Sequence, residues 1–336
     1  MSDPNSKMKH VDYGAGGGPE VLKIVEGPVP RPGPDDVLIA VAFAGVNGPD
    51  LAQRKGRYPP PPGASPLIGL EAAGTVDAVG SNVMRWKVGD EVCALTPGGA
   101  YAQYCVTNAA HCLPIPDGLT LEQAAGIPEN FFTVWTNVIE RGRLARGETI
   151  LIHGGSGGIG YSAIQVAKAW GARVIATVGS NDKAAFVRSM GADHAINYNT
   201  QDFEVEARNI VGKDGVDVIL DMVGGSYTKK NIALLGLEGR LVQISFQQGS
   251  KQAELDLLPV MVRRLTITGS TLRPQPPQNK ARIAEGLRTH LWPLFANGKI
   301  RVVIHRVFDF DDAGVVAAHT MLESGQHVGK VLLKVG

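Results

Sequence analysis

A glycine-rich turn constrains this chain more than any other segment. A short apolar run, TILIH, leads directly into GGSGGIG (154–160), and a segment of helical composition, Tyr161–Trp170, follows. Glycines between a strand and a helix allow a tight turn, close approach of the backbone to a pyrophosphate, and close packing of helix on strand. Gly155, Gly157 and Gly160 fit the pattern G-x-G-x-x-G. In this context the turn predicts a dinucleotide site.

Short apolar runs then alternate with helix-like segments. The predicted strands are 149–153, 173–178, 195–198, 216–221, 240–245 and 265–270. The predicted helices between them are 161–170, 182–190, 203–211 and 227–235. Strands alternating with helices at this spacing indicate a parallel, doubly wound sheet of the Rossmann type, with its ligand at the carboxyl ends of the strands.

The rest of the chain is organised differently. Its first third is β-rich, with apolar runs at 37–46, 73–79 and 90–95, and a tail with two strand signals around a helix is expected to return to it. This tail is residues 304–335. Two further stretches have helical composition: 121–142, with a break at Pro128, and 279–297, with a kink at Pro293. The proline loop Tyr58–Gly63 is extended because four consecutive prolines exclude helix and ladder pairing. It is either a stiff surface loop or the wall of a pocket.

Charge and composition weigh against several classes of protein. The chain has 33 Lys and Arg against 32 Asp and Glu, so nothing indicates binding to nucleic acid or to an anionic membrane. No apolar run reaches the roughly 18 residues of a membrane-spanning helix. The polar segment Met1–His10 lacks the core of a signal peptide, so we expect a flexible extension and a cytoplasmic protein. Cys93, Cys105 and Cys112 lack the close pairing of zinc ligands, which predicts buried thiols and no metal site.

The segment ATVGS (176–180) bears on the choice of nucleotide. An NAD site usually carries an acidic residue about 20 residues beyond the glycines, and this segment has none. Ser180 and Lys183 suit a 2′-phosphate, although they also fit an N-cap serine and a solvated lysine at a helix start. Asp182 is unfavourable beside a phosphate unless it points away. On balance the segment favours NADPH over NADH.

Several ordered segments of the chain match one family. They are GGPEVL (17–22), VNGPDL (46–51), GRYPPPPG (56–63), GLEAAG (69–74), AAGIPE (124–129), TILIHG (149–154), DMVGGS (221–226) and VGKVL (328–332). Together they resemble the zinc-independent quinone oxidoreductases of the medium-chain dehydrogenase/reductase superfamily, and most of all the p53-inducible quinone oxidoreductase branch, related to ζ-crystallin. The resemblance covers nearly the whole chain. It implies an α/β protein with a discontinuous GroES-like β-rich catalytic domain (1–127 and 272–336) and a Rossmann cofactor domain (128–271).

The resemblance also implies the site. The residues expected at the pyrophosphate are Gly155, Ser156, Gly157, Gly158 and Ile159. Those expected around the 2′-phosphate are Gly179, Ser180, Lys183 and Tyr198. Asn47, Tyr58 and Thr133 map near the nicotinamide, and Asn47 and Tyr58 are the expected catalytic residues, orienting the carboxamide or polarising an acceptor oxygen. The cleft for cofactor and substrate is expected to involve Ile244, Ser245, Phe246, Ser270, Thr271 and Leu272, up to Arg273.

Leu70 bears on whether the protein could use a catalytic zinc ion. Zinc-bearing relatives have Gly-His-Glu where this chain has Gly69-Leu70-Glu71, and leucine cannot ligate a metal. What remains is transfer of a hydride, or of single electrons that would give a semiquinone, from NADPH to an electron-poor acceptor. A quinone is the first expectation; an α,β-unsaturated carbonyl or enoyl thioester is the alternative. RNA binding, which the relation to ζ-crystallin allows, has little support from the charge. Phe246–Gln248 and Arg273–Pro277 differ from the branch where the acceptor should bind.

Three further expectations concern structure. His153 is expected to be a packed histidine at the end of a strand. Glu71 is expected to organise a loop rather than to act as an acid. The segment Leu265–Leu272 alternates apolar and polar residues. Relatives pair this strand across a two-fold axis, so we expect a homodimer through the edge of the Rossmann sheet, the alternative being an internal edge strand.

Overall fold

The computed structural model describes residues 6–251 and 255–336, in which the chain forms two compact units. The first unit joins Met1–Phe132 to Arg273–Gly336, and the second is Thr133–Leu272. The expected domain ends, 127 and 271, therefore lie five and one residues before the ends of these units. The units are described separately below. Their β-rich and parallel α/β architectures confirm the α/β fold class.

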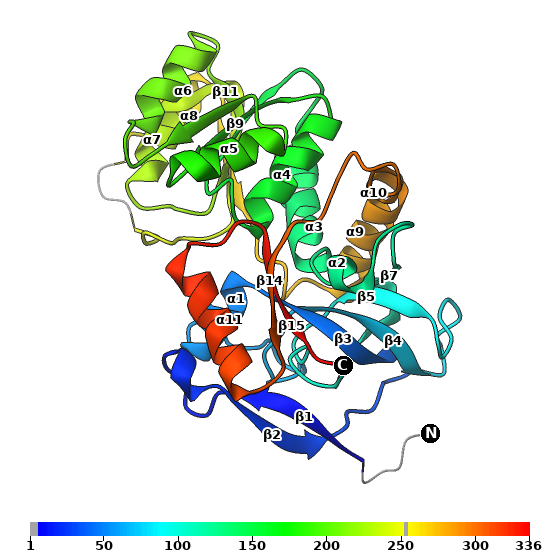
Figure 1. The fold of residues 1–336 in the computed structure, drawn as a ribbon. Helices are drawn as coiled ribbons and strands as arrows, with labels where there is room; N and C mark the ends of the chain where they lie inside the picture. The colour runs from blue at the N-terminus through cyan, green and yellow to red at the C-terminus, as the bar shows by residue number, and fades with distance from the viewer. Residues whose placement is uncertain (1–5, 252–254) are drawn as a thin grey trace. The chain divides into compact units, whose positions relative to one another are not determined.

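The second unit is built on six parallel strands (Figure 1). They are β8 (Thr149–Ile152), β9 (Arg173–Val178), β10 (His194–Asn197), β11 (Val216–Asp221), β12 (Leu235–Gln243) and β13 (Thr266–Gly269). Their order is β10-β9-β8-β11-β12-β13, which is the Rossmann order 3-2-1-4-5-6 and reverses direction between β8 and β11. All six predicted strands are confirmed, although β12 begins five residues earlier than the pattern indicated.

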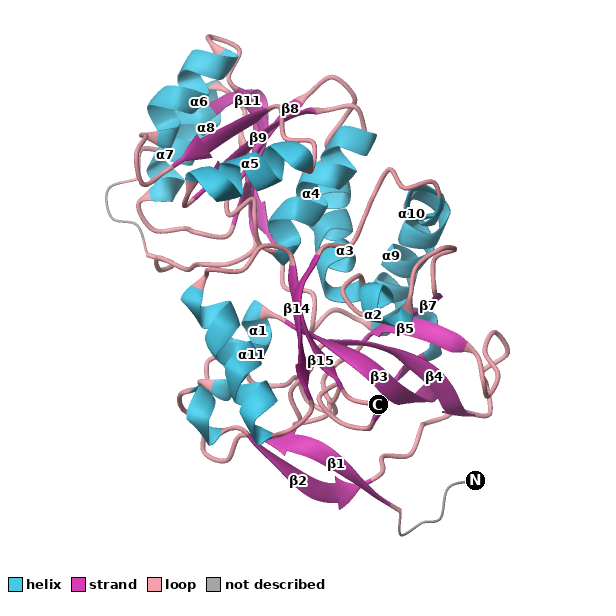
Figure 2. Ribbon diagram, viewed as in Figure 1, coloured by secondary structure: helices cyan, strands magenta, loops and turns pink. Residues whose placement is uncertain are grey.

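Helices cover both faces of this sheet, and Figure 2 shows its strands between α4 and α5 on one side and α6, α7 and α8 on the other. The helices are α4 (Gly158–Ala169), α5 (Asn181–Ser189), α6 (Phe203–Val211), α7 (Tyr227–Leu234) and the short α8 (Leu258–Val262). The strands are apolar and buried because both faces are covered. Leu151, Ile175 and Ile219 pack with Phe203 of α6 and Ile232 of α7 in the core.

The first unit contains a seven-stranded sheet in the order β14-β15-β3-β4-β5-β7, with β6 paired to β3. Its strands are β3 (Asp36–Val46), β4 (Glu71–Val79), β5 (Glu91–Leu95), β6 (Tyr104–Asn108), β7 (Cys112–Pro114), β14 (Ile304–Asp309) and β15 (Lys330–Lys334). Strand β15 lies antiparallel to β3, with Val331 opposite Val46. The tail therefore returns to the first domain, as predicted.

A separate two-stranded sheet precedes this one. Strand β1 (Lys7–Asp12) pairs along its whole length with β2 (Lys23–Pro28). The expectation of a flexible extension over Met1–His10 is therefore wrong for residues 7–10, while residues 1–5 lie outside the described ones. Met8 and Val11 are buried, and these two apolar side chains hold an otherwise polar strand on the unit.

The helices of the first unit are short, with two exceptions. They are η1 (Pro19–Val21), α1 (Gly48–Arg54), η2 (Ala109–His111), α2 (Leu121–Ala124), α3 (Pro128–Val134), α9 (Pro277–His290), α10 (Trp292–Ala296) and α11 (Asp312–Ser324). The chain continues from α3 into a π-helical turn, η3 (Trp135–Arg141). The single helix expected over 279–297 is wrong: the chain breaks at Leu291, and Pro293 is tolerated in the first turn of α10, where its missing N–H is not needed.

The three cysteines are all free and buried in the first unit, which confirms the prediction of buried thiols. Cys105 and Cys112 belong to its apolar core, beside Val37 and Ile39 of β3. Burial disfavours the charged thiolate and raises the pKa of Cys105 to about 12. These thiols are therefore packing residues rather than nucleophiles.

Candidate functional site

Most of the residues expected to bind the nucleotide follow the carboxyl ends of strands in the second unit; Asn47 and Tyr58 of the first unit and Thr133 of α3 do not. The glycine turn follows β8, Ser180 follows β9, Tyr198 follows β10, Ile244 follows β12, and Ser270 follows β13. All six strands are parallel, so their carboxyl ends lie at one edge of the sheet. This is the edge at which sheets of this kind bind ligands.

The glycine turn is shaped to receive an anion. Helix α4 begins at Gly158, three residues before the predicted start, so Gly158 and Ile159 lie in its first turn with N–H groups free of intrahelical bonds. A Cβ on Gly157, the N-cap, would meet only the Gly154 oxygen at 3.7 Å, whereas one on Gly160 would lie 2.2 Å from it. The open position suits a pyrophosphate and the crowded one packs helix on turn, so the turn fits a dinucleotide.

The residues expected at a 2′-phosphate come together beyond β9. Ser180 is the N-cap of α5 and accepts a hydrogen bond from the Lys183 backbone N–H at 3.2 Å, which leaves its own O–H as a donor. A Cβ on Gly179 would lie 2.7 Å from the Tyr198 hydroxyl, so glycine is what lets the tyrosine approach. Lys183 is half-buried, and desolvation lowers its pKa. Asp182 is exposed in the first turn of α5.

His153 is fully buried, as predicted, and anchors the turn from below. Its two ring nitrogens lie 3.0 Å from Thr177 Oγ1 and 2.8 Å from Asn231 Oδ1. Asn231 in turn donates to Asp221, whose carboxylate also accepts the backbone N–H groups of Val223 and Gly224. Burial lowers the pKa of His153 and keeps the ring neutral. The network ties β8, β9 and β11 together beneath the nucleotide edge.

Two further groups of predicted residues lie at this edge. Asn137 donates to the Thr133 carbonyl at 2.9 Å and accepts from the Ser270 hydroxyl at 2.8 Å, so it joins two predicted residues. Phe246 is half exposed, and a Cβ on Gly224 would lie 2.7 Å from its ring. The remaining predicted residues of these loops are Ile244, Ser245 and Thr271, which reach the surface in part or in full, and Leu272, which is buried.

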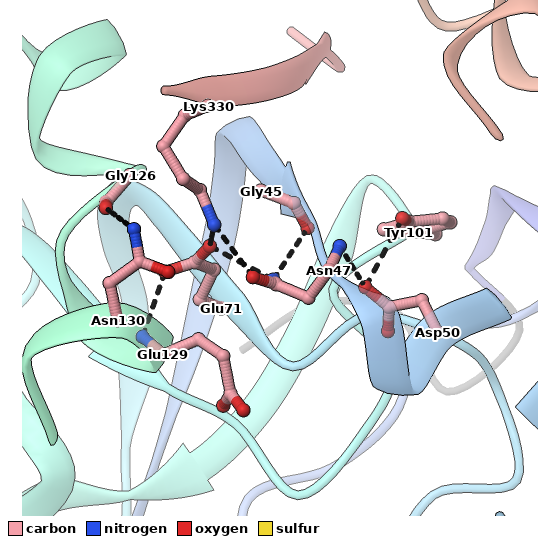
Figure 3. Close-up of polar contacts among 9 residues, drawn as sticks. All are labelled: Gly45, Asn47, Asp50, Glu71, Tyr101, Gly126, Glu129, Asn130 and Lys330. Carbon is pink, nitrogen blue, oxygen red and sulfur yellow. Dashed lines mark hydrogen bonds and ion pairs between the residues drawn. The ribbon is translucent and has the colours of Figure 1, made fainter. Parts of the chain in front are cut away.

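The first unit holds a buried charged cluster (Figure 3). The Lys330 ammonium lies 2.5 Å from Glu71 Oε1 and 2.6 Å from Asn47 Oδ1. The Asn47 amide donates to Glu71 at 2.9 Å and to the Gly45 carbonyl at 3.3 Å. These contacts give Glu71 a structural role, as expected. Both amide hydrogens of Asn47 are in use, so the predicted contact of Asn47 with nicotinamide or acceptor would require it to exchange partners.

Asp50 extends this cluster through α1. Its carboxylate accepts from the backbone N–H of Asn47 at 2.8 Å, from that of Gly69 at 3.2 Å, and from the Tyr101 hydroxyl at 3.3 Å. Burial raises the pKa of Asp50 to about 7, although the two backbone N–H groups act in the opposite direction. The capping box that Asp50 forms with Asn47 fixes the start of α1.

Glu129 is the third acid of the cluster. Its backbone N–H donates to Glu71 Oε2 at 2.8 Å. Its own carboxyl points away from the ion pair of Lys330 and Glu71 (Figure 3). Desolvation first, and then the charges of Glu71 and Asp50, raise the pKa of Glu129 to about 8. Burial is the main reason why Glu129 and Asp50 hold their protons tightly, whereas Glu71 is paired with Lys330.

Tyr58, on the proline loop, lies beneath a buried arginine. The Arg273 guanidinium carbon is 5.5 Å from the centre of the Tyr58 ring, a cation–π contact. Arg273 donates to the Pro97 carbonyl and to Gln53 Oε1, both at 2.8 Å. Burial raises the pKa of Tyr58 to about 12, so the phenol remains a hydrogen-bond donor. The loop thus packs against the unit at Tyr58, while Pro59 and Gly63 are exposed.

Three members of the cluster, which lie far apart in the sequence, were not predicted from it. Asp50, Glu129 and Lys330 were present in family-matching segments, but no role was assigned to them. Their apolar surroundings were the available signal, because charged residues within such segments are rarely buried without a partner. In the described part of the chain, no group of three or more His, Cys, Asp or Glu is arranged to hold a metal ion. No helix among the described residues is long and apolar enough to cross a membrane.

Two family models match the chain. Residues 33–117 match the alcohol dehydrogenase GroES-like domain, and residues 158–285 match the zinc-binding dehydrogenases. Among curated proteins, a mycocerosic acid synthase-like polyketide synthase of Mycobacterium tuberculosis is 31% identical over 304 residues, which are 90% of this chain. The chain spans only 14% of that protein's length.

Similar solved structures carry three different names. An NAD-dependent alcohol dehydrogenase is 32% identical, with a TM-score of 0.84 over 98% of this chain and 100% of the other. The quinone oxidoreductase of Escherichia coli, solved with NADPH, is 29% identical, with a TM-score of 0.84 over 98% and 100%. The JamJ enoyl reductase is 28% identical, with a TM-score of 0.86 over 98% and 100%. The shared architecture is thus accompanied by different acceptors and cofactors.

Proposed function

Because this chain belongs to the medium-chain dehydrogenase/reductase superfamily, and is an oxidoreductase with an NAD(P)-binding Rossmann domain, we propose that it is a zinc-independent NADPH:quinone reductase. The second unit would hold the dinucleotide, with its pyrophosphate at the start of α4. The bound nicotinamide supplies a hydride to the acceptor. The family model that matches residues 158–285 is that of the zinc-binding dehydrogenases, so the residues at the zinc position must show whether zinc could bind there.

The observation that carries the proposal is the buried contact of Lys330 with Glu71 and Asn47. In zinc-bearing relatives a histidine precedes the glutamate; here Leu70 stands in its place and is 2% exposed. Glu71 is fully committed to the Lys330 ammonium, the Asn47 amide and the Glu129 backbone N–H. A second cation beside Lys330 would be repelled. Activation by a Lewis acid therefore has no ligand set at this position, which favours acceptors that are already electron-poor.

The choice of NADPH rests on Ser180, Lys183 and Tyr198. Ser180 and Lys183 begin α5 directly after β9, where an NAD enzyme carries a carboxylate, and the Tyr198 hydroxyl lies beside Gly179. A half-buried lysine and a serine O–H are complementary to a 2′-phosphate, which offers several strong acceptors. Similarity to the Escherichia coli enzyme solved with NADPH supports this choice, whereas similarity to an NAD-dependent dehydrogenase makes it a matter for experiment.

Reduction of an activated alkene is the alternative function. It is favoured by the similarity to the JamJ enoyl reductase and to a polyketide synthase. A quinone and an α,β-unsaturated carbonyl have the same requirement: an electron-poor π system held in place without metal. On the first unit, the Tyr58 phenol would donate a hydrogen bond to an acceptor oxygen, since its pKa of about 12 keeps it protonated.

The direct test is to follow NADPH oxidation against a panel of quinones, enones and enoyl thioesters, with NADH in parallel and with and without a zinc chelator. We expect turnover with NADPH and a quinone that the chelator leaves unchanged. Turnover confined to enoyl thioesters would establish the alternative. Loss of activity on chelation, with recovery on adding zinc, would contradict the proposal.

We also propose that the protein forms a homodimer through the edge of the Rossmann sheet. Strand β13 pairs only with β12 among the described residues, so its outer edge is open. Large apolar side chains at this edge and on α8 are between 45% and 71% exposed: Leu257, Leu258, Met261, Val262 and Ile267. A second copy would cover them and pair the open strand. Sedimentation should show a dimer that Met261→Glu with Ile267→Lys converts to a monomer; a monomeric wild type at micromolar concentration contradicts this.

A further inference from the structure

The acid Glu129 has no role in the reaction proposed above. It occupies the second position of α3 and is only 9% exposed. Its backbone is held by Glu71, while its carboxyl oxygens have no hydrogen-bond partner among the residues that the structure describes. In Figure 3 the carboxyl turns away from the ion pair of Lys330 and Glu71. A buried carboxyl without a partner is costly to a fold, so it calls for an explanation beyond stability.

Burial is the main reason why Glu129 favours its protonated form, and the neighbouring charges add smaller effects. Glu71 and Asp50 repel a negative charge there, and Lys330 and Lys280 attract one. The lysines have other partners, because Lys330 pairs with Glu71 and Lys280 donates to the Arg273 carbonyl at 2.6 Å. With burial added, the pKa of Glu129 rises to about 8. Near neutral pH the group is therefore an acid that holds a proton and can release it.

Glu129 also lies within electrostatic range of Tyr58 on the proline loop. After burial, the charge of Glu129 is the next largest cause that raises the pKa of Tyr58, and the same charge acts on the pKa of Arg273. The Arg273 guanidinium lies over the same tyrosine ring, and its Nη2 is buried without a hydrogen-bond partner. Tyr58, Glu129 and Arg273 thus bring three hydrogen-bond donors to one place in the first unit. Such a group suits an oxygen that gains negative charge.

We propose that Glu129 is the proton donor that completes reduction of an α,β-unsaturated carbonyl, with Tyr58 and Arg273 around the carbonyl oxygen. This inference rests on the proposed function and concerns its activated-alkene branch. The hydride from the reduced nicotinamide brings two electrons to the β-carbon, and the π electrons move toward the oxygen. The O–H bond of Glu129 then breaks as a C–H bond forms at the α-carbon. Water returns the proton to the carboxylate, and the products are the saturated carbonyl and the oxidised nucleotide.

Quinones provide the internal contrast. A reduced quinone takes its protons on oxygen, where exchange with water is fast, so water can replace Glu129. An enolate takes its proton on carbon, which is slow without a positioned acid. Loss of the acid should therefore slow enone reduction strongly and quinone reduction little.

The experiment compares wild type, Glu129→Gln and a control, Glu122→Gln, which removes a partly exposed acid on α2. Each reduces an α-methyl enone and a benzoquinone with NADPH between about pH 6 and pH 10. We expect wild-type kcat for the enone to fall above about pH 8 as Glu129 loses its proton. Glu129→Gln should lose that limb and about 100-fold in enone kcat, but only a few-fold for the quinone. In D2O, wild type should place deuterium on one face of the α-carbon, and the variant on both.

The results separate this inference from the function beneath it. If Glu129→Gln retains the enone rate, the pH limb and the single-face labelling, Glu129 is not the donor, and the reductase assignment stands. If wild type reduces neither acceptor, the proposed function fails.

A measurement without turnover tests the acid itself. Infrared difference spectra of wild type should show a protonated carboxyl that disappears between about pH 7 and pH 9, in line with a pKa of about 8. The same signal should be absent from Glu129→Gln and present in Glu122→Gln. A Glu129 carboxyl that is already ionised near pH 6 overturns the inference whatever the kinetics show.

Discussion

The glycine turn of the second unit and the charged cluster of the first depend on opposite features of their side chains. The turn consists of seven consecutive residues, 154–160, and works because side chains are missing. The cluster joins Lys330 to Glu71 across 259 positions and to Asn47 across 283, and works because charges are present and buried. The first kind of site is local and visible in a sequence. The second exists only once distant strands have paired.

The two sites should therefore fail differently. Added atoms will break the turn, since a Cβ has nowhere to go at its crowded position. Removed atoms will break the cluster, since each buried charge depends on its partner. The following predictions test this contrast, from the largest expected effect to the smallest.

Gly160→Val should have the largest effect. Its Cβ would lie 2.2 Å from the Gly154 oxygen, so turn and helix must separate. We expect a loss of about 3 kcal/mol or more in the free energy of unfolding, and no measurable NADPH binding. Gly157→Ala is the matched control, because its Cβ has open space. It should retain stability in thermal melts yet weaken NADPH binding by fluorescence titration. Equal melting losses in both variants would show that crowding is not the cause.

Lys330→Met should destabilise the first unit by about 3–5 kcal/mol, because it leaves Glu71 charged, buried and without its cation. Urea unfolding measures the loss. Adding Glu71→Gln to Lys330→Met should recover more than half of it, since the orphaned charge is then gone. If the double variant is no more stable than Lys330→Met, the cluster is not held by the ion pair.

Lys183→Ala should raise the Michaelis constant for NADPH by about 10- to 100-fold and leave that for NADH nearly unchanged. A charge-assisted hydrogen bond to the 2′-phosphate contributes about 1.5–3 kcal/mol. Lys213→Ala, which removes an exposed lysine of the same unit, should change neither constant. Equal effects of Lys183→Ala on both nucleotides would remove the 2′-phosphate assignment and return Lys183 to a helix-start residue.

The smallest effect is the slope of stability against pH, because one titrating group changes the free energy of unfolding by at most about 1.4 kcal/mol per pH unit. Glu129 has a folded pKa of about 8 against an ordinary value of 4.5, so the folded state holds its proton after the unfolded chain has lost it. The unfolding free energy should therefore fall as pH rises from about 4.5 to about 8, and then level off. Asp50, with a pKa of about 7, acts in the same direction. Melting curves should show a shallower fall for Glu129→Gln, and an equal slope would contradict a protonated Glu129.

Prediction from sequence succeeded where a pattern was long or repeated. All six Rossmann strands and the return of the tail were found, because apolar runs between turn residues report burial on a covered sheet. Short polar elements were missed. Strand β1, KMKHVD, has too few apolar residues for its sequence to predict a strand. It is held in place by pairing with β2. The break between α9 and α10 was also missed, since one kinked helix and two helices share the same pattern.

By itself the sequence determined the dinucleotide turn, the parallel sheet and the leucine at position 70, because each depends on neighbouring residues and on covalent geometry. Only the tertiary structure decided that Glu71 pairs with Lys330, that Asn47 has no free amide hydrogen, and that Glu129 is buried. The physical reason is the range of the interaction. A φ angle or a missing Cβ acts within a few residues, whereas the pKa of an acid depends on whichever charges and apolar atoms the fold brings around it.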